Sequence, residues 1–321
     1  MSAEGSKKAI VAALLANAGI ALAKFVGFLV TGSSSMLAEA VHSVADTSNQ
    51  GMLLLGQKRA GREADKLHPF GYGRSRYFYS FVVALVLFTL GSLFAIYEGI
   101  HKIQHSHDHG LESPLVAVVI LVVAICLESY SFATAYRESR PLKGTTSWWR
   151  FIRNSRTPEL PVVLLEDSGA LIGLLLALGG VGLTMITDDA VWDGVGTLCI
   201  GILLGIIAVI LIVEMKSLLI GEGATEDEEA QLLAALQSDG VDRVIHMKTQ
   251  YLGPEEMLVA AKIAIPAGAD AVRIAETIDS AEARVRSAVP QRGSYISNPT
   301  STVALADPRD THAVNHGCRP G

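Results

Sequence analysis

Six long apolar segments follow one another along the first two thirds of the chain. They lie at residues 9–30, 35–57, 77–100, 114–136, 159–186 and 190–214. Each is about as long as the roughly 20 residues that a helix needs to cross the hydrocarbon core of a bilayer. Each also contains a few polar residues, which a simple membrane anchor would not need. The pattern predicts an all-α bundle of six transmembrane helices over residues 1–214.

The pattern changes after residue 215 to that of a small soluble domain. Two amphipathic segments have helical periodicity, and three shorter segments have strand character. In chain order they are helix 225–239, strands 241–250 and 257–265, helix 271–289 and strand 294–298. This α-β-β-α-β order predicts a two-layer α+β domain at 215–300 that serves as a dimerisation module. Residues 301–321 lack apolar periodicity, so we expect a disordered tail.

Composition agrees with a membrane protein. Of the 321 residues, 50% are hydrophobic and 18% are charged, whereas soluble domains have about 25% charged residues. The net charge of −6 gives no indication of a nucleic-acid partner. Cys126, Cys199 and Cys318 are widely spaced, which suggests neither a disulfide framework nor a zinc cluster. No bound cofactor is expected.

Basic residues gather on one side of the expected bundle. They precede the first segment, lie between the second and third and between the fourth and fifth, and follow the sixth. By the positive-inside rule, both termini and the α+β domain should be cytoplasmic. The first apolar run is long and lacks a clear cleavage site, so it should be a span and not a cleaved signal. With no transit segment visible, we expect a bacterial plasma membrane.

A histidine and an aspartate lie inside the second apolar segment. His42 and Asp46 are four residues apart, so their side chains share one helix face. Together they provide half of a divalent-metal site. Ionisable groups at membrane depth are costly and often mark an ion path or a ligand site. The alternative is that the two side chains pair with each other and hold the bundle together.

Two adjacent acids lie deep in the fifth segment. Neighbouring helical residues diverge by about 100°, so only one of Glu166 and Asp167 should face the same point as His42 and Asp46. We expect this to be Asp167. Gly169 and Gly173 lie near its face and would allow another helix to approach closely. Two half-sites on separate helices fit a metal site in a bundle core.

These residues carry a resemblance to a known family. The run TGSSSMLAEAVHSVADTSNQ at 31–50, HPFGYGR at 68–74 and the acid of the fifth segment resemble the cation diffusion facilitators. The resemblance implies a homodimeric antiporter that exports divalent metal in exchange for protons. It also implies that His42, Asp46 and Asp167 are metal ligands. The pattern is similar to a divergent branch that includes mitochondrial zinc transporter-like proteins.

One position departs from the family pattern. The resemblance places a further ligand four residues before Asp167, where this chain has Val163, which cannot coordinate a metal. The fourth ligand is then Glu166, a water or absent. Histidine with carboxylates suits Zn²⁺ best, with Fe²⁺, Co²⁺ and Ni²⁺ as alternatives and Mn²⁺ less favoured. A metal-dependent intramembrane enzyme acting on lipid and a membrane metal sensor are the rival functions.

Several other residues allow two readings. Lys24 is either a counter-charge to Asp46 or Asp167 or a structural partner, and Glu128 either joins a proton path or has a structural role. The histidines between 101 and 109 either receive released metal or form a solvated loop. Arg74 is a candidate for an inter-subunit salt bridge with Glu214 or Glu222. The α+β domain has only His246 before its tail, which predicts little metal affinity there.

Overall fold

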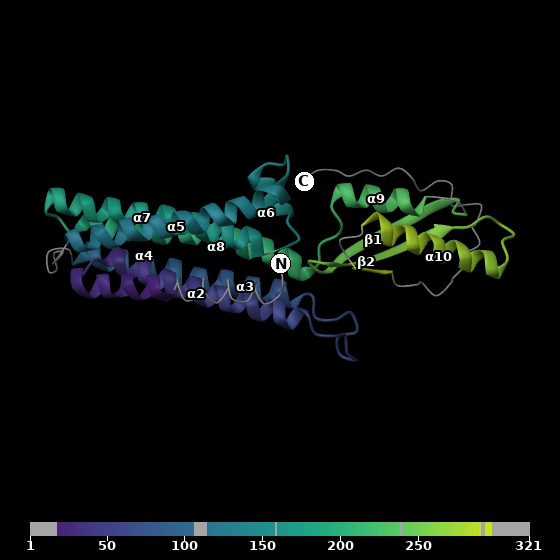
Figure 1. Cartoon of the computed structure of the whole chain (residues 1–321), viewed down its shortest axis with the longest axis horizontal. Helices are drawn as coiled ribbons and strands as arrows, with labels where there is room; N and C mark the ends of the chain where they lie inside the picture. The colour runs from purple at the N-terminus through teal and green to yellow at the C-terminus, as the bar shows by residue number, and fades with distance from the viewer. Residues whose placement is uncertain (1–17, 106–113, 158, 238–239, 290–292, 297–321) are drawn as a thin grey trace. The chain divides into compact units, whose positions relative to one another are not determined.

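The computed structural model describes residues 18–105, 114–157, 159–237, 240–289 and 293–296. The chain divides into two compact units, Met1–Ile220 and Gly221–Gly321, and each is treated by itself. The first unit is helical and the second contains a sheet (Figure 1). The expected outline, a helical membrane-type part followed by a small α+β unit, is therefore present.

The helices of the first unit run roughly alongside one another (Figure 1). They are the described part of the first helix, Ala18–Thr31, and then α2 Ser34–Ala60, α3 Ser75–Val86, the π-helix η1 Leu87–Leu93, α4 Phe94–Gln104, α5 Pro114–Lys143, α6 Trp148–Asn154, α7 Glu159–Thr187 and α8 Val191–Ile220. Segments α3, η1 and α4 follow without a break and correspond to one predicted span.

Four helices in the described part of the chain are long and apolar enough to cross a bilayer. They are Ser75–Gln104, Leu115–Arg137, Pro161–Thr187 and Val191–Ile220. Helix α2 has 27 residues, which is long enough, but its polar side chains lower its mean hydropathy. The first helix, Ala18–Thr31, is a shorter apolar helix. Thus four of the six predicted spans are long and apolar enough, in the described part of the chain, to cross a bilayer.

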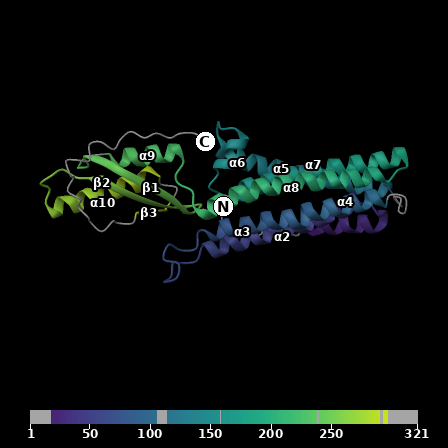
Figure 2. The ribbon, with the colours of Figure 1, turned by 180° about the vertical axis from the view of Figure 1, so that it is seen from behind.

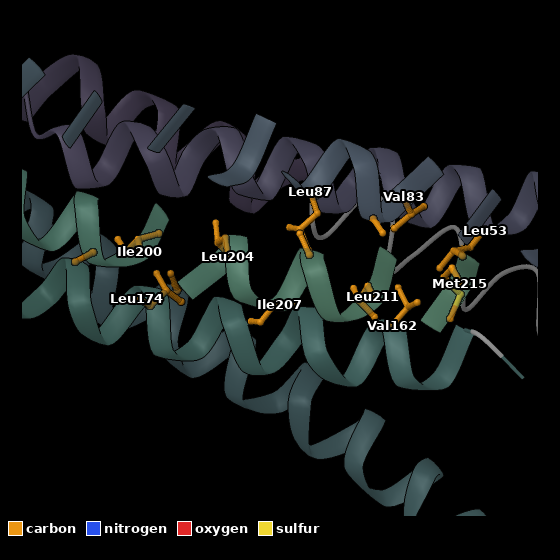
Figure 3. Packing of buried hydrophobic residues seen from close by; sticks show 14 of the residues in the cluster. Leu53, Val83, Leu87, Val162, Leu174, Ile200, Leu204, Ile207, Leu211 and Met215 are labelled. Carbon is orange, nitrogen blue, oxygen red and sulfur yellow. The ribbon is translucent and has the colours of Figure 1, made fainter. Parts of the chain in front are cut away.

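Helix α8 supplies the centre of the apolar core. Its buried residues recur at spacings of three and four, which places them on one helix face. Figure 3 shows this row lying between residues of α7 and residues of α2, α3 and η1. The labelled residues of the row are Ile200, Leu204, Ile207, Leu211 and Met215. Because α8 packs against so many neighbours, the positions of the other helices depend on it.

A buried carboxylate of α8 holds the N-terminus of α2. Asp193, with 0% exposure, accepts hydrogen bonds from the backbone N–H of Ser34 at 2.7 Å and from the hydroxyl of Ser33 at 2.8 Å. The hydroxyl of Ser35 also donates to this carboxylate. A negative charge is favourable at a helix N-terminus, where backbone N–H groups lack helical partners. This interaction fastens the start of α2 to α8.

Ion pairs link helices near the basic end of this unit. Arg76 of α3 pairs with Glu159 of α7, and Arg153 of α6 lies 3.3 Å from Glu214 of α8. Glu214 therefore has a partner within the chain, whereas the Nε of Arg74 is buried without a hydrogen bond. The expected inter-subunit bridge of Arg74 stays a prediction.

The described residues of the second unit form two helices and a three-stranded sheet. Its elements are α9 Glu226–Leu236, β1 Arg243–Gly253, β2 Glu256–Ala264, α10 Ala271–Ala288 and β3 Gly293–Ile296. Strand β2 lies between β1, with which it is antiparallel, and β3, with which it is parallel. The three strands are labelled in Figure 2. Leu232 and Val285 of the helices pack with Tyr251, Met257 and Val259 of the strands. Both helices thus share one core with the sheet.

We predict that Asp193→Ala destabilises the first unit. The substitution leaves the buried Ser33 and Ser35 hydroxyls and the Ser34 N–H without their acceptor, at a cost on the order of 2–3 kcal/mol. Thermal unfolding in detergent measures the effect. Asp189→Ala is the matched control, because the Asp189 side chain is exposed and accepts a hydrogen bond from Val191 N at the surface. Equal unfolding temperatures for the two variants would contradict the prediction.

Candidate metal centre

A polar stripe runs along the buried face of α2. Glu39, His42, Asp46 and Asn49 are spaced by three or four residues, so they follow one side of the helix. Glu39, His42 and Asn49 are at most 1% exposed, and the Asp46 side chain is 18% exposed. The helix places two carboxylates, an imidazole and an amide inside an otherwise apolar bundle. Such groups need charged or hydrogen-bonding partners to offset their desolvation.

His42 and Asp46 approach each other as the spacing predicts. The Nε2 of His42 lies 3.5 Å from Oδ2 of Asp46. Both ring nitrogens of His42 and Oδ1 of Asp46 are buried without a hydrogen-bond partner. Unpaired buried polar atoms are costly, at about 1–3 kcal/mol each. An imidazole nitrogen and a carboxylate oxygen are ligands that Zn²⁺ prefers, so the unsatisfied atoms fit a bound cation.

The two acids of α7 face different helices. Asn49 of α2 donates from Nδ2 to Oε1 of Glu166 at 2.8 Å, and Glu166 is 7% exposed. Ser131 of α5 donates to Oδ2 of Asp167 at 3.1 Å. The hydrogen bonds therefore join Glu166 to α2, whereas we expected Asp167 to face this helix. The divergence of adjacent helical residues is seen, and Glu166 takes the position next to the stripe.

Asp167 nevertheless belongs to the same charged neighbourhood. The Asp46 carboxylate interacts electrostatically with Asp167 and with Glu128 of α5. Glu166 interacts with both Asp46 and Asp167. Within the described residues, no three histidine, cysteine or acidic side chains lie close enough together to form a ready metal cluster. The arrangement is a His–Asp pair with acids of α5 and α7 around it.

The remaining predicted positions of α7 are apolar or small. Val163 is half-buried against the core and offers no ligand atom. A Cβ atom at Gly173 would lie 2.6 Å from Oε1 of Glu39, and one at Gly169 would lie 2.7 Å from Cδ1 of Ile207. The two glycines thus allow α7 to approach α2 and α8 closely, which is the role expected of them.

Glu39 is a buried acid that sequence reasoning missed. The Lys24 Nζ lies 3.1 Å from Oε2 of Glu39 and donates to the Ser43 hydroxyl at 2.8 Å. Lys24 therefore pairs with neither Asp46 nor Asp167 directly. The available signal was the spacing, because Glu39 lies one helical turn before His42 on the same face.

Two of the four histidines at 101–109 lie in the described part of the chain, at the end of α4. The rings of His101 and His105 stack with centroids 4.5 Å apart. The other two, His107 and His109, lie outside the described residues. The proposed metal-receiving role of this loop stays a prediction.

Hydrogen bonds to Asp65 hold together the loop between α2 and α3, which includes the HPFGYGR run. Its carboxylate accepts hydrogen bonds from the Tyr72 hydroxyl at 2.7 Å and from the N–H groups of Leu67 at 2.9 Å and His68 at 2.7 Å. The Tyr72 hydrogen bond and those from the backbone lower the pKa of Asp65 to about 2. Arg62 lies over the Tyr72 ring at 4.7 Å. Tyr72 and the carboxylate thus shape an exposed turn.

Comparison with known families agrees with this geometry. Residues 10–220, about two thirds of the chain, match the cation efflux transmembrane domain. The chain belongs to the cation efflux family. This confirms the resemblance to the cation diffusion facilitators, which are transporters and not enzymes.

Curated relatives point to one branch of this family. A mitochondrial proton-coupled zinc antiporter of Mus musculus is 34% identical over 254 residues, 78% of this chain and 44% of the relative. A metal tolerance protein of Arabidopsis thaliana is 30% identical over 80% of this chain and 57% of its own length. The magnetosome protein MamM of Magnetospirillum gryphiswaldense is 27% identical over 72% of this chain and 68% of its own length. The chain spans about half the length of the zinc antiporters it matches.

The expected bacterial plasma membrane is contradicted by these relatives. The similar zinc antiporters of mouse, frog and human are all named mitochondrial. Our expectation rested on the lack of a visible transit segment. That argument fails because the start of this chain carries no information on targeting when the matched relatives are about twice as long. A multi-pass membrane protein remains in agreement with the family.

We predict that Asn49→Ala weakens zinc binding more than Ser131→Ala does. Asn49 orients Glu166 and Ser131 orients Asp167, and loss of a group that orients a ligand typically costs about 10–100-fold in metal affinity. Equilibrium binding of Zn²⁺ to the purified protein in detergent measures both variants. A larger loss in Ser131→Ala would contradict the prediction and show that Asp167 contributes more to metal binding than Glu166 does.

Proposed function

We propose that this chain is a transporter that exchanges a divalent transition metal, foremost Zn²⁺, for protons. The observation that carries the proposal is the buried His42–Asp46 pair, which has nitrogen and oxygen atoms without hydrogen-bond partners. The Asp46 carboxylate also interacts electrostatically with acids of α5 and α7. Membership of the cation efflux family and the name of the mouse relative support the same chemistry.

The ligand set that we propose is His42, Asp46 and the acids Glu166 and Asp167. Glu166 is the α7 acid joined to the α2 stripe by a hydrogen bond, whereas Asp167 approaches from the α5 side. Val163 contributes nothing, so Glu166 replaces the ligand that the family pattern would provide there. A mixed nitrogen and oxygen donor set favours Zn²⁺, and also suits Fe²⁺, Co²⁺ and Ni²⁺ better than Mn²⁺.

We also propose how the helices and the α+β unit are arranged in the working transporter. The first helix and α2 complete a bundle of six spans, with the polar stripe of α2 shielded from lipid by its neighbours. Burying polar side chains toward the bundle interior is the arrangement that a membrane permits. The α+β unit joins two copies of the chain into a homodimer. Exposed His246 is the one histidine in the described part of that unit, which argues against a metal-sensing role.

Proton coupling follows from competition at one atom. The unperturbed pKa of imidazole, about 6.5, lies near neutral pH. Metal coordination requires an unprotonated nitrogen, so a proton and a metal ion exclude each other at His42. Protons arriving from the acidic side displace the metal, and metal arriving from the other side displaces protons. Exchange then needs no separate proton relay.

We predict that His42→Asp flattens the dependence of zinc transport on the opposing pH and raises the Mn²⁺ to Zn²⁺ rate ratio. The replacement removes the titrating imidazole and leaves an all-oxygen site, which suits Mn²⁺. Initial rates of both metals in proteoliposomes, measured across a series of lumenal pH values, give the answer. Asp46→Ala serves as the inactive control, since it removes an anionic ligand and should abolish transport. An unchanged pH profile and metal ratio in His42→Asp would rule out this role for His42.

We predict that the separate α+β unit, residues 216–300, dimerises without metal and binds zinc only weakly. The reason is the lack of clustered histidines and cysteines in this segment. Analytical ultracentrifugation with and without chelator measures the dimer, and calorimetry measures zinc binding. Submicromolar affinity would reveal a regulatory site, and His246→Ala would then test whether it uses this residue.

A further inference from the structure

A second charged site lies one helical turn from the His42–Asp46 pair. Glu39 of α2 is 0% exposed, and Lys24 of the first helix is 1% exposed. Their side chains form an ion pair of 3.1 Å, and Lys24 also donates to the Ser43 hydroxyl. A buried ion pair gains little net stability, because desolvation of both charges offsets their attraction. Its position inside the proposed transport path therefore suggests a role beyond stability.

Only half of the Glu39 carboxylate is satisfied. Oε2 contacts Lys24, whereas Oε1 is buried without a hydrogen-bond partner. The unpaired oxygen points toward Gly173 of α7, where a Cβ would lie only 2.6 Å away. The glycine thus leaves room beside this oxygen that any larger residue would fill. Glu39 also interacts electrostatically with His42 and Asp46, so it belongs to the same field as the proposed ligands.

Lys24 is a cation tethered inside a negatively charged interior. In the described part of the transmembrane unit, the acids Glu39, Asp46 and Glu128 interact with His42. Lys24 is a cation that interacts with Glu39 and Asp46 among these acids. An ammonium group and a divalent metal ion are attracted to the same carboxylate. Unlike the metal ion, the ammonium cannot leave, and it can only move on its four-carbon stem.

We infer that Glu39 is an additional carboxylate for the transported divalent cation, and that Lys24 is a built-in competitor that occupies this carboxylate until the cation arrives. The inference rests on the proposed function and adds a second station to its path. In this arrangement Lys24 limits how tightly the protein holds the metal. Weak binding at a second station favours release, as a transporter requires.

The test measures zinc binding and zinc flux in variants that replace a charged side chain by a neutral one. Zn²⁺ binding to the full chain in detergent at about pH 8, well above the ordinary carboxyl pKa, gives a dissociation constant. Zinc flux in proteoliposomes gives the half-saturating concentration and the maximal rate. Lys24→Met should lower both the dissociation constant and the half-saturating concentration by on the order of tenfold, equivalent to about 1.4 kcal/mol, with a slower maximal rate. Lys24→Gln, which can still hydrogen-bond Ser43, is the second variant should Lys24→Met fold poorly.

Three further variants separate this role from a structural one. Glu39→Gln should raise the dissociation constant, and the double variant Lys24→Met/Glu39→Gln should resemble Glu39→Gln and not the wild type. Thermal unfolding in detergent tests the structural alternative, in which the two single variants are equally destabilised, the double variant recovers stability, and neither dissociation constant changes. Lys102→Met neutralises another buried lysine, which donates to Gly32 O at 3.3 Å, and should leave both constants unchanged.

The outcomes distinguish this inference from the proposed function. If the wild type binds zinc but shows no proton-driven flux, the proposed function fails, and the binding constants still decide the role of Glu39. If the wild type transports zinc and neither Lys24→Met nor Lys24→Gln tightens binding, Lys24 is not a competitor and the inference is wrong.

Discussion

The cost of placing charge inside an apolar bundle governs the structure of the transmembrane unit. The buried charged and amide side chains of α2 need charged or hydrogen-bonding partners to offset their desolvation. Glu39 finds Lys24 on the first helix, and Asn49 finds Glu166 on α7. These contacts fix how α2 is rotated relative to its neighbours. Between them lie His42 and Asp46, whose free atoms are the chemical reason to expect a cation there.

The fold was largely predictable because its signals are strong and local. The apolar runs of α5, α7 and α8 and the alternating helices and strands of the second unit are visible in the pattern of side chains alone. The prediction for α2 was less direct, because its polar stripe lowers the hydropathy on which span prediction depends. The same polar residues indicated the metal site. They therefore made the transmembrane span harder to predict and the site easier to predict.

Other features of the site depend on contacts between distant segments. Spacing predicted that Glu166 and Asp167 diverge, but the choice of which acid faces α2 depends on the rotation of α7 as a whole. Glu39 was missed because its partner is 15 residues earlier on a different helix. Asp193 was missed because, from the sequence, it is simply the next acid after Asp188 and Asp189. Its role exists only once α2 and α8 are side by side. The cellular membrane was predicted wrongly, since targeting is not encoded in the packing of the helices.

The carboxylate of Asp193 also defines a pivot. It fixes the first residues of α2 to α8, so if α2 tilted against its neighbours, the axis of the tilt would lie near Ser33 and Ser34. Displacement then grows along the helix, which rises about 1.5 Å per residue. Asn49 lies about 20 Å from this axis and His42 about half as far. A small tilt about this axis would therefore displace Asn49 about twice as far as His42, so the contact between α2 and α7 would open first at the Asn49–Glu166 hydrogen bond.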